Sequence, residues 1–80
     1  MTEPDILETL TRTLGDLLAD DTIRLTMGTR RTDVPEWDSF AYINFIVAVE
    51  QEFGIKFGIA EVESFETVGS IVRRIEQLTS

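Results

Sequence analysis

Ser39, in the stretch EWDSF at residues 36–40, is the side chain whose position raises a question about chemistry. It directly precedes the most apolar run of a chain that has no cysteine and no histidine. Thiol chemistry, imidazole metal ligands and the commonest general base are therefore excluded, and no metal site is expected. A serine hydrolase would also need a G-x-S-x-G elbow, which is absent. The hydroxyl is not expected to be a catalytic nucleophile.

Two roles remain for Ser39 at the start of a predicted helix. Its hydroxyl could accept hydrogen bonds from the first-turn amides as an N-cap, which its position alone favours, although Asp38 could fill the same role. The hydroxyl could instead be modified. A helix N-terminus presents unpaired amides and the positive end of the helix dipole, so a phosphate esterified to Ser39 would be electrostatically favourable.

The segment that must position Ser39 is SFAYINFIVAVEQEF, residues 39–53. It contains no glycine or proline and is long enough for about four helical turns. Its β-branched residues would also suit a strand, but its length exceeds that of most strands and it shows no two-residue alternation. Helical spacing predicts a buried stripe made of Tyr42, Phe45, Ile46, Val49 and Phe53.

A second apolar group lies outside this stripe. Phe40 and Val47 fall on nearly the opposite side of the helix, and Ile43 lies between the two groups. A single exposed apolar residue is commonly incidental. A contiguous apolar patch rimmed by charge, however, marks a place where another protein docks. We therefore expect Phe40, Ile43 and Val47 to contact a partner.

The two ends of the chain are each expected to form a helix with one buried stripe, and Thr2 and Thr67 are the predicted N-caps. The first stripe comprises Ile6, Leu7, Leu10, Leu14, Leu17 and Leu18, and the last comprises Val68, Ile71, Val72, Ile75 and Leu78.

A long loop and a short helix complete the expected fold. Residues 20–37 lack periodicity, and Ile23, Leu25 and Val34 are expected to point inward and pin the loop. A short helical segment is expected around Ile59. The sequence therefore predicts a single all-α domain over residues 1–80, a small four-helix bundle with three main helices, one short helix and a long loop between helices 1 and 2.

The composition is acidic, with a formal net charge of −8 at pH 7, and residues 36–66 hold seven acidic residues against one lysine. This excess is compatible with a solubilising face, but it also favours basic partners over nucleic acid or membrane surfaces. The first residues do not resemble a signal peptide, and no segment approaches a membrane span of about 20 apolar residues. We therefore expect a cytoplasmic protein, which we take to be a monomer.

The sequence resembles an acyl carrier protein over nearly its whole length. The centre of the resemblance is Asp38-Ser39-Phe40, which is similar to the family's Asp-Ser-Leu signature at the start of the second helix. The block VEQEFGIKF, residues 49–57, is similar to the end of that helix in the family, and ETVGSIV, residues 66–72, to the start of the last helix. The tripeptide alone is a weak signal, but the three blocks at this spacing form a specific one.

The resemblance implies that Ser39, beside Asp38, is the attachment point of 4′-phosphopantetheine, transferred from coenzyme A by a separate magnesium-dependent phosphopantetheinyl transferase. The thiol that holds an acyl or aminoacyl group would belong to this arm, and the protein itself would be a non-catalytic carrier. Its other partners would be an acyl- or aminoacyl-loading enzyme and a downstream synthase or transferase. The implied partner-binding residues are Phe40, Ile43 and Val47, with an acidic rim of Glu36, Asp38, Glu61 and Glu63.

Several positions depart from the carriers of fatty acid synthesis, which usually have acidic residues two and five positions after the serine. Ala41 and Asn44 occupy these positions here. Phe40 replaces the leucine of the signature, and Trp37 replaces a residue that is often small. This pattern favours a stand-alone carrier of a specialised polyketide, nonribosomal peptide or related pathway.

Two alternatives stay open at this point. One is an unmodified helical adaptor that binds a partner through Phe40 and Val47, with Ser39 serving only as a cap. The other concerns Arg30 and Arg31, which precede the site. Solvated loop charge is the favoured interpretation of these two residues, and a contact with the phosphate of the arm is the alternative.

Overall fold

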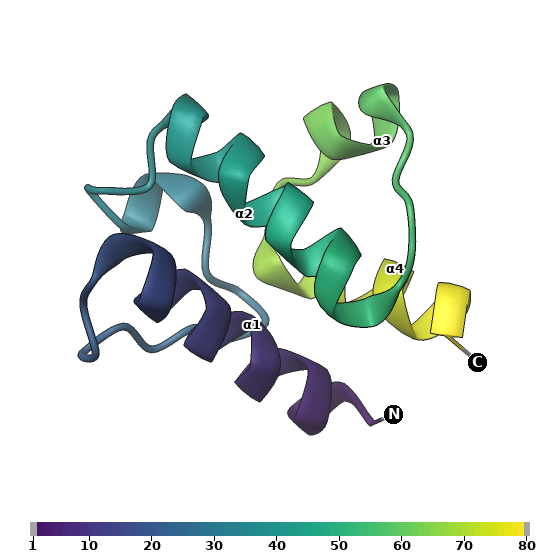
Figure 1. Cartoon of the computed structure of the whole chain (residues 1–80), viewed down its shortest axis with the longest axis horizontal. Coiled ribbons are helices and arrows are strands. Elements are labelled where there is room, and N and C mark those ends of the chain that lie inside the picture. Colours follow the sequence, from purple (N-terminus) through teal and green to yellow (C-terminus); the bar gives the residue numbers. More distant parts are fainter. Residues whose placement is uncertain (1, 80) are drawn as a thin grey trace.

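The computed structural model describes residues 2–79, and within them the protein is helical with no strand. The long helices are α1 (Glu3–Leu18), α2 (Ser39–Phe53) and α4 (Val68–Thr79), and the short ones are α3 (Ile59–Ser64) and a 3₁₀ turn, η1 (Arg31–Asp33). Figure 1 shows α2 between α1 and α3, and α1 packs against both α2 and α4. The all-α bundle of three main helices and one short helix is confirmed. None of the helices described is long and apolar enough to cross a membrane.

The ends of α2 are set by the residues that flank it. The side chain of Asp38 accepts a hydrogen bond from the Ala41 amide at 2.9 Å and caps the N-terminus. Gly54 lies in the left-handed region, with a φ of 66°, and its amide donates to the Glu50 carbonyl. Because glycine adopts this conformation without strain, the helix ends where the sequence predicted.

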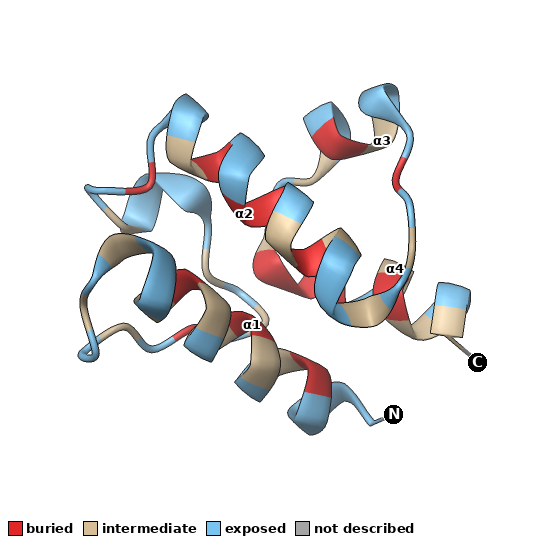
Figure 2. Cartoon of the chain, in the orientation of Figure 1, coloured by how far each residue is buried: buried red, intermediate tan, exposed pale blue. Residues whose placement is uncertain are grey.

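The core forms where the apolar stripes of α1, α2 and α4 meet, and Figure 2 shows the buried bands of these helices turned toward one another. Among the fully buried side chains are Ile6, Leu10 and Leu14 of α1, Phe45 and Val49 of α2, and Ile71, Val72 and Ile75 of α4. The burial of Leu25, and the partial burial of Ile23 and Val34 against this core, confirm that the long loop is pinned by these three residues.

The long loop is also held by backbone contacts with the start of α4. The Val68 amide donates to the Thr29 carbonyl and the Gly69 amide to the Met27 carbonyl, both at 2.8 Å. A Cβ at Gly69 would lie 2.6 Å from the Met27 carbonyl oxygen, so this approach requires glycine. The contacts fix the chain directly before η1, which lies beside the start of α2.

Five residues predicted to be buried are not fully buried. Leu7, Leu18 and Phe53 are half-buried against the core, Leu17 is 40% exposed and Leu78 is 37% exposed. All of them except Leu7 lie in the last turn of their helices. The helical spacing places these four on the correct face, but neighbouring helices no longer cover that face at the ends of the bundle.

Candidate functional site

Ser39 is the first residue of α2, and its side chain is exposed. The interpretation of Ser39 as the N-cap is wrong, because Asp38 holds that position and its carboxylate accepts from the first turn. Within residues 2–79 the Ser39 hydroxyl makes no hydrogen bond to another group. The hydroxyl is therefore free and solvent-facing at the positive end of the helix dipole.

A cleft of about 490 Å³ lies beside Ser39. Its walls come from residues 30–32 at η1, the first turns of α2 and the segment 62–68, which runs from α3 into α4. We call it the Ser39 cleft. The walls mix aromatic and aliphatic side chains with charged ones, because three elements that are distant in sequence meet here.

Trp37 anchors the base of the site, although sequence reasoning treated it only as a departure from a family pattern. Its side chain is 3% exposed and packs edge-to-face against Tyr42 and Phe45, with ring centroids 6.1 and 5.1 Å apart. Trp37 precedes the Asp38 cap, and Tyr42 is the fourth residue of the helix, which is the spacing of a hydrophobic staple. That spacing was the signal in the sequence that identifies Trp37 as a core residue.

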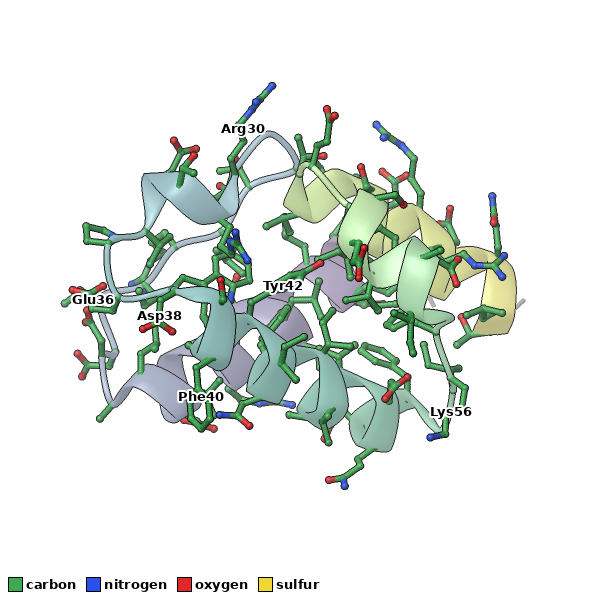
Figure 3. The ribbon with its side chains drawn as sticks, turned by 90° about the horizontal axis from the view of Figure 1, so that it is seen from above. Arg30, Glu36, Asp38, Phe40, Tyr42 and Lys56 are labelled. Atoms are coloured by element: carbon green, nitrogen blue, oxygen red, sulfur yellow. The ribbon has the colours of Figure 1, made fainter. Side chains whose placement is uncertain are left out.

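Tyr42 links α2 to α3. Its hydroxyl donates a 2.7 Å hydrogen bond to the Val62 carbonyl, and Figure 3 shows the side chain extending from α2 toward α3. Arg31 lies on the other side of the tyrosine, with its guanidinium carbon 5.1 Å from the ring centroid. Tyr42 therefore connects both walls of the Ser39 cleft.

Burial raises the pKa of the Tyr42 phenol, and the positive charge of Arg31 opposes the rise. A folded-state pKa above the unfolded value gives a stabilisation that is present below pH about 10 and is lost as pH rises through the folded-state pKa. We expect the free energy of unfolding to fall above pH about 10, and this fall to be smaller in Tyr42→Phe.

Denaturant titrations of both proteins over this pH range measure the effect. The absorbance of tyrosinate gives the pKa directly, because Tyr42 is the only tyrosine. Titration at the pH of a free tyrosine would contradict the prediction.

The three residues predicted to contact a partner are exposed on α2. Phe40 is 78% exposed, Ile43 53% and Val47 46%, and Phe40 points away from Tyr42 in Figure 3. Sequence reasoning missed Ile59, which is 81% exposed at the start of α3. Only the three-dimensional arrangement distinguishes Ile59 from Val62, which is three residues later and buried.

The predicted acidic rim is only partly exposed. Glu36, Asp38 and Glu63 are exposed, and Figure 3 shows Glu36 and Asp38 together at the beginning of α2. Glu61 is half-buried, accepts a hydrogen bond from the Gly58 amide and forms an ion pair with Arg74 of α4. The carboxylate of Glu61 therefore already has partners within the chain.

Two comparisons with known proteins bear on the family of this chain. A family model described as "Phosphopantetheine attachment site" matches residues 37–75, which run from Trp37 into α4. The solution structure of a holo acyl carrier protein from Geobacter metallireducens superposes with a TM-score of 0.83 at 32% sequence identity, and the alignment covers 90% of this chain and 83% of that one. The chain belongs to the acyl carrier protein family, whose prosthetic group is covalently attached 4′-phosphopantetheine.

Proposed function

We propose that Ser39 is the attachment residue for 4′-phosphopantetheine, and that the protein carries an acyl or aminoacyl group as a thioester for polyketide, nonribosomal peptide or related biosynthesis. The observation that carries the proposal is the free, exposed hydroxyl of Ser39 at the start of α2. Since Asp38 supplies the cap, Ser39 can be esterified without loss of a hydrogen bond that the helix needs.

The residues around Ser39 fit the prosthetic group. Its phosphodiester carries a negative charge, which the first amides of α2 favour. The arm supplies the thiol that a chain without cysteine lacks. The Ser39 cleft offers apolar surface from Ile43 and Val62 next to the attachment point. In this role the protein holds and presents the arm, and it is not itself an enzyme.

The partners that we propose are a phosphopantetheinyl transferase, a loading enzyme and a downstream synthase or transferase. Phe40, Ile43 and Val47 are available to them as an apolar patch. The exposed carboxylates of Glu36 and Glu63 favour a basic partner surface and accelerate encounter more than they tighten binding.

The proposal of a specialised pathway rests on two acidic residues that carriers of fatty acid synthesis usually have and this chain lacks. Ala41 and Asn44 leave two positions of α2 uncharged where carriers of that pathway usually present acids. A dedicated set of enzymes that docks mainly on the apolar patch fits this surface better.

Intact-mass measurement tests the proposal. After incubation with coenzyme A, magnesium and a promiscuous phosphopantetheinyl transferase, we expect each chain to gain the mass of one phosphopantetheine group. Fragmentation of the modified protein should locate that mass at Ser39. No gain, or a gain at another residue such as Ser64 or Ser70, would remove the proposal.

A further inference from the structure

Arg31 is a cation at the wall of the Ser39 cleft that has no anionic partner among the described residues. The ion pairs found in residues 2–79 involve Arg12 with Glu52 and Arg74 with Glu61. The guanidinium of Arg31 instead lies over the ring of Tyr42. Stacking on a ring leaves the N–H donors at the edge of a guanidinium available to an anion.

The position of Arg31 relative to Ser39 follows from α2. Ser39 and Tyr42 are three residues apart and so lie on the same face of the helix, with Cβ atoms about 5–6 Å apart. Because Arg31 contacts Tyr42 and lines the same cleft as Ser39, its charge lies close to the attachment point.

The charges around the cleft are divided between its two sides. Glu63 of α3 and Glu66 of the segment after it line one side, and the cations among the described residues that line the cleft, Arg30 and Arg31, are on the side of η1. An anion linked to Ser39 is therefore repelled from one wall and attracted to the other. Figure 3 shows Arg30 pointing away from α2, which leaves Arg31 as the cation that faces the site.

We propose that Arg31, held by the Tyr42 ring, is a positioning residue that contacts the phosphodiester of the arm and directs the arm toward η1. This inference rests on the proposed attachment at Ser39. A bias of this kind reduces the set of directions in which the arm leaves the protein, so it affects presentation of the cargo and not its chemistry.

The test compares two substitutions that remove the same charge, Arg31→Gln and Arg30→Gln, together with Arg31→Lys. Each full chain is modified with coenzyme A and a promiscuous transferase, and intact mass verifies the product. We expect Arg31→Gln to shift the ³¹P resonance of the phosphodiester, Arg31→Lys to restore it in part and Arg30→Gln to leave it unchanged. Added salt should move the wild-type resonance toward that of Arg31→Gln.

A second measurement excludes an effect that comes only from loss of the contact with Tyr42. Denaturant titrations of the unmodified and modified forms give the change in folding equilibrium on modification. Modification should increase the folding equilibrium constant about two- to fivefold more in the wild type than in Arg31→Gln, which is the size expected for an exposed ion pair. Because each modified protein is compared with its own unmodified form, the contribution of the contact with Tyr42 cancels.

The outcomes separate the two proposals. Failure of the wild type to gain mass removes both. Modification at Ser39 with equal resonances for Arg30→Gln and Arg31→Gln overturns only the role of Arg31. The effect of Arg31→Gln could also appear only when the arm carries a dicarboxylic acyl group, and not when its thiol is free. That result would show that Arg31 binds a carboxylate of the cargo, and it would overturn the phosphodiester contact.

Discussion

Replacing Ser39 by alanine is expected to abolish modification by a phosphopantetheinyl transferase and to leave the fold intact. The reaction needs the hydroxyl oxygen, and alanine has none. The fold does not need it, because Ser39 is exposed and the Asp38 carboxylate caps α2 through the Ala41 amide. A surface substitution of this kind changes the free energy of unfolding by about 0.5 kcal/mol or less. Intact mass and a denaturant titration measure the two results.

Ser39→Asp and Ser64→Ala are the controls for this experiment. Aspartate suits the first turn of a helix, so Ser39→Asp should fold as well as the wild type and also gain no mass. Ser64→Ala removes another exposed serine and should be modified like the wild type. The adaptor hypothesis predicts that Ser39→Asp keeps full function in the native pathway. Retention of that function would favour the adaptor over the carrier.

The parts of the fold that the sequence predicted depend on local chemistry. Thr2, Asp38 and Thr67 have side chains that cap helices, and Gly54 ends α2 because it tolerates a positive φ. Helical spacing then identified most of the buried residues. Phe53 was predicted to be buried but is only half-buried. Spacing determines which face of a helix a residue lies on, and it does not determine how far along the helix that face is covered.

The parts of the site that the sequence could not predict depend on contacts between distant segments. Arg31 and Tyr42 are eleven positions apart, and only the path of the long loop brings the guanidinium over the ring. That path depends on Gly69, whose lack of a side chain admits the Met27 carbonyl. Likewise, the ion pair that occupies Glu61 requires α4 to pack beside α3. No pattern of spacing within one element reveals such pairs.

Replacing Phe45 by alanine is expected to cost about 3–5 kcal/mol of stability, which is a large part of the about 5–15 kcal/mol of a native domain. Phe45 is fully buried in α2, and its ring packs edge-to-face on Trp37 at 5.1 Å. The substitution removes apolar contacts and leaves a cavity where α1, α2 and α4 meet. Urea titration measures the loss, and Phe45→Leu supplies a smaller, measurable loss if the alanine variant is unfolded in water.

Phe40→Ala is the matched control, because it makes the same change on the same helix at a side chain that is 78% exposed. It should cost about 0.5 kcal/mol or less. Phe53→Ala should fall between the two, since its ring is half-buried at the end of α2. Equal losses for Phe40→Ala and Phe45→Ala would mean that the core and docking faces of α2 are wrongly assigned. The expected order leaves Phe40 available to contact a partner, because its side chain contributes little to the stability of the fold.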